Sequence, residues 1–305
     1  MSKISFIKSA DRKYNISRSL SLIKGEIISG IKNAKNIVIK PNCVVTDYQL
    51  AATNVEALDA LLEFIFPYAK NQIILAEGTG VGETFEAFKN YKYFSIQEKY
   101  GFAFIDLNND EFETIELVDR HNKKWPAQVA KTIINSDYLI SLTVPKTHNE
   151  VVYTGAIKNI AVGSLLRPEG NFAARIATRF GIARNNKAMI HQGYKTINKN
   201  IATLAKKIKI DLAIIDGFSA MQGNGPSHDG ELVPAHWALA SSNALSADLL
   251  ALNLMSIPLA DVGYLSILDQ EQPEIEPFII GDDWKGAITK FKMPDNYEKQ
   301  RKWHE

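Results

Sequence analysis

The apolar residues of this chain fall into two alternating patterns. Short continuous apolar runs predict buried strands, and longer stretches with apolar residues every three or four positions predict helices. The predicted strands cover residues 4–7, 37–40, 72–77, 102–107, 138–144, 211–215 and 278–280. The predicted helices cover residues 20–31, 55–66, 84–91, 127–134, 197–208 and 247–255. This order predicts an α/β fold, a mostly parallel sheet with helices on both faces, built as one body or as two lobes.

Length and composition add limits to this picture. The chain has 305 residues, which we divide into one α/β domain over 1–290 and a polar C-terminal tail over 291–305. Lys and Arg total 35 against 34 Asp and Glu, and no basic stripe occurs, so no nucleic-acid partner is expected. No uncharged apolar run approaches membrane-spanning length, so no membrane partner is expected either. We expect a cytoplasmic protein; the oligomeric state is open.

Polar residues gather directly after the predicted strand 138–144. Lys146, Thr147 and His148 follow it, and Lys158 and Asn159 come after a glycine in a segment of good helix formers. In open α/β sheets, ligands bind at the carboxyl ends of the strands. A cation and an amide near a helix start, facing a cation and an imidazole, suit a carboxylate or phosphate. Taken singly, Lys146 and Lys158 are more often solvated and a residue such as His148 more often caps a loop, whereas the cluster as a whole favours a site.

Two earlier strands also end in polar residues. Lys40 ends the strand 37–40 and Asn42 follows it, where the two form a candidate second wall of the pocket or part of an ordinary turn. Glu77 ends the strand 72–77, and the glycine-rich turn with Gly78 and Gly80 precedes a helix. Such a turn can cradle an anion, but its spacing lacks the dinucleotide and phosphate-loop fingerprints, so a tight turn is an equal alternative.

A long glycine-rich loop is predicted after the strand that ends at Asp216. Gly223 and Gly225 lie in it, and His228 and Asp229 follow. Loops of this length in compact domains usually act as lids or binding loops. Asp216 with His228 and Asp229 can bind a divalent metal or act as base and orienter, although no second histidine stands at a fixed spacing.

Other reactive residues are interpreted as structural. Cys43, the single cysteine, excludes an internal disulfide and a cysteine-ligated iron-sulfur cluster, and we interpret it as a small buried residue. Arg175 and Arg179 lie one turn apart on a predicted helix and can line an anionic groove, but surface solvation is the preferred interpretation. His191 is interpreted as structural.

Seven short motifs occur in an order that resembles the bacterial and archaeal domain-of-unknown-function family 362. They are KPN at Lys40, EG at Glu77, KTH at Lys146, TGAIKN at Thr154, DLAIIDG at Asp211, GNGP at Gly223, and ASSNALSAD before the last predicted core helix. The resemblance covers nearly the whole chain. Some members of the family carry ferredoxin-type cysteine motifs, which this sequence lacks, so no redox role is implied here.

A local pattern is also similar to nickel-pincer lactate racemases. His148, Gly155 and Lys158 match the H…GG-x-K segment of those enzymes, and the histidine and lysine are ten residues apart, as in that segment. The likeness implies that Lys158 tethers a cofactor and that His148 binds metal or moves protons. Ala156 replaces the second glycine and Val162 replaces a proline, so a tethered or metal cofactor is one alternative among others.

Two hypotheses about function follow. The first is an enzyme, of isomerase or racemase type, in which lysines hold a small carboxylate or phosphate compound and His148 is the acid or base. The second is a non-catalytic accessory protein that binds a ligand or a metal for another enzyme. The enzyme hypothesis requires one shared cavity lined by Lys40, Glu77, Lys146, His148, Lys158 and Asp216.

Overall fold

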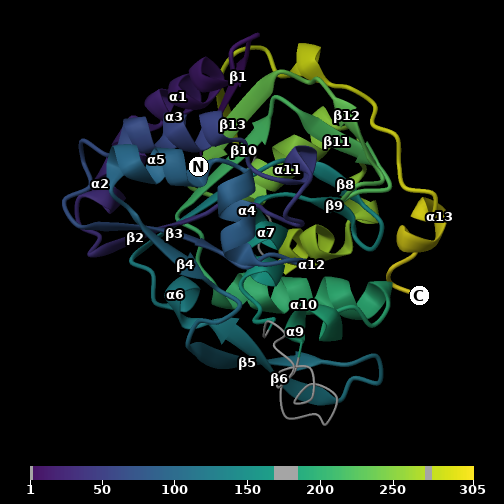
Figure 1. Cartoon of the computed structure of the whole chain (residues 1–305). Coiled ribbons are helices and arrows are strands. Elements are labelled where there is room, and N and C mark those ends of the chain that lie inside the picture. Colours follow the sequence, from purple (N-terminus) through teal and green to yellow (C-terminus); the bar gives the residue numbers. More distant parts are fainter. Residues whose placement is uncertain (1–2, 168–184, 272–276) are drawn as a thin grey trace.

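The computed structural model describes residues 3–167, 185–271 and 277–305, so Arg175 and Arg179 lie outside the described residues. Its centre is an eight-stranded sheet in the order β14-β1-β13-β10-β7-β2-β3-β4 (Figure 1). These strands are β1 (Lys3–Lys8), β2 (Asn36–Lys40), β3 (Gln72–Glu77), β4 (Ala103–Asp106), β7 (Tyr138–Thr143), β10 (Leu212–Gly217), β13 (Trp237–Ser241) and β14 (Phe278–Gly281). Only β13 runs antiparallel to its two neighbours, which confirms the mostly parallel sheet within the described residues.

Helices cover both faces of this sheet, as expected. One face packs against α1 (Arg12–Leu22), α2 (Lys24–Ile31), α3 (Val55–Ile65), α4 (Thr84–Asn90) and α5 (Tyr93–Tyr100). The other packs against α7 (Ala156–Gly163), α10 (Tyr194–Lys207), α11 (Ala244–Leu254) and α12 (Gly263–Glu271). Successive strand residues serve opposite faces: Ile37 and Ile39 join the first core, and Val38 joins the second.

Two smaller sheets lie outside the central one. The first has the order β12-β11-β8-β9, from β8 (Lys146–His148), β9 (Val152–Thr154), β11 (Ala220–Gly223) and β12 (Gly230–Val233). The loop expected after Asp216 therefore contains a β-hairpin. The second sheet is the hairpin of β5 (Phe112–Val118) and β6 (Lys124–Ala130), at the lower edge of Figure 1.

The predicted helix over 127–134 is wrong for its first half. Residues up to Ala130 belong to β6, and only α6 (Lys131–Ile134) is helical. Trp125, Ala127 and Val129 are buried at every second position, which is the period of a strand. Short helices elsewhere are α9 (Asn186–Met189) and α13 (Tyr297–Gln300), with 3-10 turns at η1 (Gln49–Ala51), η2 (Leu259–Asp261) and η3 (Lys285–Ala287).

The end of the chain packs on the domain despite its polar composition. Phe291 is buried, the Gln300 Oε1 atom accepts a hydrogen bond from the Val152 amide at 2.7 Å, and the Trp303 Nε1 atom donates to the Ala260 carbonyl. These contacts hold residues after 290 against β9 and η2. Among the described helices, none combines the length and the apolar character that crossing a membrane requires.

Helix α7 is fixed at its start by a carboxylate from α11. Asp248 accepts hydrogen bonds from the amides of Ala156 at 2.8 Å and Ile157 at 2.9 Å, and from the Tyr153 hydroxyl at 3.0 Å. Burial raises the pKa of Asp248 to about 6. A Cβ atom on Gly155 would lie 2.1 Å from the Asp248 Oδ1 atom, so this close approach requires glycine. Asp248 thereby sets the position of the residues that follow in α7.

Asp248→Ala should destabilise the fold strongly, because it leaves two buried amides and a buried hydroxyl without an acceptor. We expect a loss of about 3–5 kcal/mol of unfolding free energy. Asn54→Ala is the matched control, since Asn54 caps α3 through a single bond to the Glu56 amide nearer the surface, and should cost about 1 kcal/mol. Urea denaturation of both variants gives the comparison; equal losses would contradict the role of Asp248.

Candidate functional site

A cavity of about 360 Å³ lies at the carboxyl ends of β2 and β3, beside β8 and α7. It brings together eight of the residues that the sequence suggested for a site. They are Lys40, Asn42, Glu77, Gly78, Gly80, His148, Lys158 and Asn159. Their roles remain candidates, but their meeting point is the edge of the sheet where α/β proteins bind ligands.

Lys40 and Glu77 form a buried ion pair at this cavity. Lys40 ends β2 and Glu77 ends the neighbouring β3; their Nζ and Oε1 atoms are 2.7 Å apart, and their side chains are 1% and 2% exposed. The Lys40 ammonium also donates to the Pro41 carbonyl and to the Asn159 side-chain oxygen, each at 3.1 Å. Since an ammonium has three protons, these three acceptors use them all.

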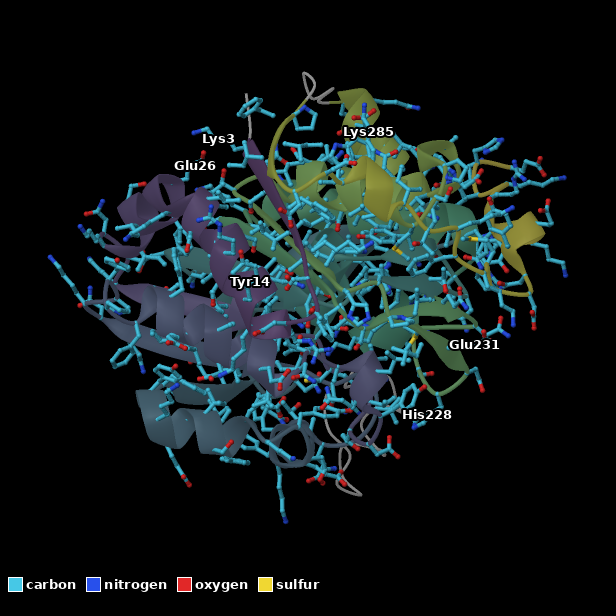
Figure 2. The ribbon with its side chains drawn as sticks, turned by 90° about the horizontal axis from the view of Figure 1, so that it is seen from above. Lys3, Tyr14, Glu26, His228, Glu231 and Lys285 are labelled. Carbon is cyan, nitrogen blue, oxygen red and sulfur yellow. The ribbon has the colours of Figure 1, made fainter. Side chains whose placement is uncertain are left out.

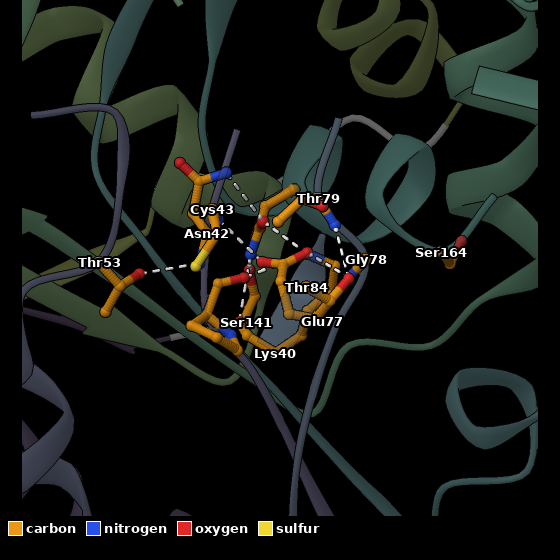
Figure 3. A network of polar contacts seen from close by, with 12 residues as sticks. Lys40, Asn42, Cys43, Thr53, Glu77, Gly78, Thr79, Thr84, Ser141 and Ser164 are labelled. Carbon is orange, nitrogen blue, oxygen red and sulfur yellow. Dashed lines mark hydrogen bonds and ion pairs between the residues drawn. The ribbon is translucent and has the colours of Figure 1, made fainter. Parts of the chain in front are cut away.

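The Glu77 carboxylate ties this pair to the surrounding backbone (Figure 3). Its Oε1 atom accepts from the Gly78 amide at 2.8 Å, and its Oε2 atom accepts from the Cys43 amide at 2.9 Å. Burial raises the pKa of the Cys43 thiol well above its usual value. The pair is therefore a fixed part of the cavity wall, and the cysteine beside it is held as a neutral thiol.

Lys146 reaches the cavity through Asn42. Its ammonium donates to the Asn42 Oδ1 atom and to the Val144 carbonyl, and its side chain is fully buried behind the described lining. Burial, followed by the charge of Lys158, lowers the pKa of Lys146 to about 7. Thr147 points elsewhere, since its hydroxyl donates to the Gly223 carbonyl at 2.8 Å.

The glycine-rich turn after β3 directs its amides into the protein. The amides of Gly80 and Val81 both donate to the Val44 carbonyl, at 3.0 and 3.2 Å, and the Gly78 amide donates to Glu77. A Cβ atom on Gly80 would meet that Val44 oxygen at 3.0 Å. These bonds favour the tight-turn interpretation over the anion cradle, because the amides are already occupied.

Cations bind the carbonyls of the same turn. Lys187 donates to the Gly78 carbonyl at 2.5 Å and to the Asn108 Oδ1 atom at 2.9 Å, and Arg167 donates to the carbonyls of Thr79 and Gly82. Burial lowers the pKa of Lys187 to about 7. Both residues line the cavity, and sequence reasoning assigned neither to the site.

Lys158 and His148 are in direct contact. The Lys158 Nζ atom, in the first turn of α7, is 2.9 Å from the Nε2 atom of His148 in β8. Both side chains line the cavity, and the residues are 8% and 4% exposed. Burial lowers the pKa of Lys158 to about 8; burial and the charge of Lys158 lower that of His148 well below its usual value. The His148 Nδ1 atom accepts from the Glu150 amide at 3.0 Å.

The described lining carries more basic than acidic side chains. The basic ones are Lys40, Lys158, Arg167 and Lys187, and the acidic ones are Glu77 and Glu150. At the rim, the Nδ1 atom of His191 is 2.8 Å from Glu150, and this contact lowers the pKa of Glu150. His191 therefore lies at the candidate site, although its sequence context indicated a structural residue.

Asp216, Gly223 and Gly225 lie outside the described lining. Asp216 pairs with Arg12 of α1 at 3.1 Å in a separate pocket, and the two glycines contact the strand and turn around Thr147 through their carbonyls. His228 pairs with Asp47 at the periphery, near Glu231 (Figure 2). The expected meeting of Asp216 with His228 does not occur. Four of the six residues expected to line one cavity do so, namely Lys40, Glu77, His148 and Lys158; Lys146 contacts the lining residue Asn42, and Asp216 lies in a different pocket. Within the described residues, no group of three or more His, Cys, Asp or Glu side chains is arranged to hold a metal ion.

Comparison with known proteins identifies the family. The model described as Domain of unknown function (DUF362) matches residues 37–253. The chain belongs to this family. The match includes every candidate residue discussed above, from Lys40 to Gly225, and confirms the resemblance that the motifs indicated.

Individual similarities are more distant. The thylakoid-associated protein sll1697 of Synechocystis sp. is 20% identical over 299 residues, which cover 95% of this chain and 78% of that protein. The lactate racemase apoprotein from Thermoanaerobacterium thermosaccharolyticum is 18% identical over 82% of this chain, with a TM-score of 0.49. A protein of known structure from Thermotoga maritima is 12% identical over 74% of this chain, with a TM-score of 0.45. This DUF362 chain spans 55% of each solved structure, and similarity at this level says nothing about its reaction.

Breaking the Lys40–Glu77 pair on one side should destabilise the fold, because it leaves a buried charge without its partner. We expect Glu77→Gln and Lys40→Met each to cost about 3–5 kcal/mol, and the double variant to cost clearly less than their sum. A double-mutant cycle by chemical denaturation measures the coupling. The exposed pair Lys124–Glu116 serves as control and should show none. Additive losses at positions 40 and 77 would rule out the pair as a unit.

Stability should depend on pH through Lys158. Its pKa falls from about 10.5 in the unfolded chain to about 8 in the fold, so between these values the unfolded state binds more protons and the unfolding free energy rises with pH. Lys158→Met should reduce this slope by about one proton, or ~1.4 kcal/mol per pH unit. Denaturation between pH 8 and pH 10 tests this, with the exposed Lys209→Met as control. Equal slopes in wild type and Lys158→Met would refute the shift.

Proposed function

We propose that this protein is an enzyme that moves a proton on a small carboxylate or phosphate compound, with Lys158 and His148 as the proton-transfer pair. The observation that carries this proposal is their 2.9 Å contact inside the cavity. An amine with a pKa of about 8 can give or take a proton near neutral pH, which is what general acid-base catalysis requires. Perturbed titratable groups in a cavity are typical of active sites.

The charge of the cavity supports an anionic substrate. Lys40 is paired with Glu77, and Arg167 and Lys187 bring two further basic groups to the side of the cavity formed by the glycine turn, where they donate to backbone carbonyls. The Nε2 atom of His148 faces the Lys158 amine at 2.9 Å, and its Nδ1 atom is occupied by the Glu150 amide proton. Lys158 would therefore take the proton of the substrate, with the His148 Nε2–H as the neighbouring donor.

The reaction class that fits these groups is isomerisation or racemisation at a carbon next to a carboxylate. Such a reaction needs one group to remove a proton and another to return it, and it needs no further reactant. The cytoplasm is the compartment we propose for it. A lysine amine in a cavity can also hold a cofactor covalently, and a mass increment on Lys158 in protein from its native host would reveal one.

Solvent deuterium exchange tests the proposal. Purified protein in D₂O should exchange a C–H proton in at least one member of a panel of hydroxy and oxo acids, next to the carboxylate in a hydroxy acid and next to the carbonyl group in an oxo acid, and NMR follows the exchange. Lys158→Ala and His148→Gln should each lower the rate by about 10²–10⁴-fold. Lys209→Arg, on the surface, should leave it unchanged.

Intact mass and ligand retention are measured on the same preparations. Retention of a panel member without exchange, equal in wild type and Lys158→Ala, would overturn the enzyme proposal and leave a binding protein of the accessory kind. Exchange that survives both substitutions would place the chemistry elsewhere.

A further inference from the structure

We infer that Lys158 is a nucleophile that forms an imine with the carbonyl group of a small oxo acid. This inference rests on the proposed function for the anionic character of the substrate, and it adds a covalent role for the lysine. The arrangement of hydrogen-bond donors around His148 carries it, together with the different surroundings of the three lysines that line the cavity.

His148 presents a donor, not an acceptor, to Lys158. Its Nδ1 atom accepts the Glu150 amide proton, so that nitrogen carries no proton of its own. A neutral imidazole has one N–H, which must then be on the Nε2 atom. This N–H points at the Lys158 Nζ atom, 2.9 Å away. The contact is satisfied only if the Lys158 nitrogen offers a lone pair, and a free lone pair is what makes an amine nucleophilic.

The amines of the other two lysines of the lining are surrounded by oxygen acceptors. Lys40 donates to three oxygens, one of them the Glu77 carboxylate, and Lys187 donates to the carbonyls of Gly78 and Thr79 and to Asn108. Three oxygen acceptors stabilise an ammonium. Among the described residues, the hydrogen-bond partner of the Lys158 Nζ atom is His148. Lys158 is therefore the amine of this cavity that is prepared to react.

The cavity selects a carbonyl compound that bears an anionic group. Imine formation needs an aldehyde or ketone carbon at the Lys158 Nζ atom. Arg167 and Lys187 supply positive charge on the side formed by the glycine turn, and together with the small volume they favour a short oxo acid over a neutral ketone. The acidic Glu150 is turned toward His191 at the rim.

The step balances with the groups present. The Lys158 nitrogen attacks the carbonyl carbon, a C–N bond forms as the C=O π bond opens, and one N–H proton passes to the oxygen to give a carbinolamine. The C–O bond then breaks: the hydroxyl takes the Nε2 proton of His148 and leaves as water, and the second N–H proton of the lysine nitrogen passes to His148 and restores its Nε2–H. The products are the imine and one water molecule. No oxidant, reductant or other reactant is consumed. Protonation of the imine then makes the C–H bonds on the carbon next to the former carbonyl acidic, which extends the proton transfer proposed above to oxo acids.

Reductive trapping tests the inference. The full-length protein is incubated with pyruvate and sodium cyanoborohydride near pH 7.5, and adducts are located by intact mass and peptide mapping. We expect one reduced pyruvate adduct, on Lys158, formed at least tenfold faster than adducts on exposed lysines. Acetone, a ketone without a carboxylate, should react at least tenfold more slowly. Lys158→Arg removes the nucleophilic amine and should abolish this adduct, and Lys209→Arg should not change it.

Each outcome decides between the two proposals. Labelling at Lys158 no faster than at exposed lysines of the wild-type protein overturns the inference, even if Lys158→Arg fails to fold. Deuterium exchange without trapping would support the proton-transfer enzyme and rule out the imine. Trapping on Lys158 without exchange would support the imine and rule out the proton-transfer step. His148→Gln supplies a further check: it keeps a donor at this position but cannot carry the proton, so trapping should slow at least tenfold.

Discussion

The carboxylate of Asp248 is the constraint on which the candidate site depends. It holds the first two amides of α7, and it can approach them because residue 155 is glycine. Lys158 is the residue directly after Ile157, so the contacts of Asp248 with the start of α7 set the position of the Lys158 amine relative to His148. The cost of the arrangement is a buried carboxylate, whose pKa rises to about 6 even with three donors around it. The start of α7, which carries the candidate residue Lys158, is thus fixed by the Asp248 carboxylate, whose ionised form is itself destabilised by desolvation.

Burial acts differently on each lysine because each has different acceptors. Lys40 keeps a carboxylate partner, and Lys187 has a set of neutral oxygens that stabilise its ammonium but leave its pKa lowered. Lys158 has an imidazole that offers it a proton. The same desolvation that weakens the fold at neutral pH therefore leaves Lys158 as the lysine whose amine faces a proton donor and not oxygen acceptors. The proposed reactivity and the local instability have a single physical cause.

Much of the fold and about half of the candidate site could be predicted from the sequence. Strand ends such as Lys40 and Glu77 meet because parallel neighbours end at one edge, and that follows from order and apolar pattern. The face of the sheet on which a side chain lies is harder to predict. In β10, Leu212 and Ile214 serve the core under α1, so Asp216, two residues on, pairs with Arg12 there and not with α7. The alternation of buried and exposed residues along β6 was also hard to see in the sequence, because Ala and Gln suit a helix as well as a strand.

The glycine-rich turn after β3 shows most clearly why part of the candidate site could not be predicted from the sequence. A strand, glycines and a helix start predict amides that face an anion, yet these amides are occupied by Val44 and Glu77. What the turn offers outward is its carbonyls, and carbonyls bind cations. Lys187 and Arg167 donate to these carbonyls, although both lie about a hundred residues away in the sequence. No rule based on local spacing can predict a contact over that separation. The positive charge beside the cavity is therefore a consequence of satisfying backbone oxygens, and any anion that binds there would use a potential created by the turn's own geometry.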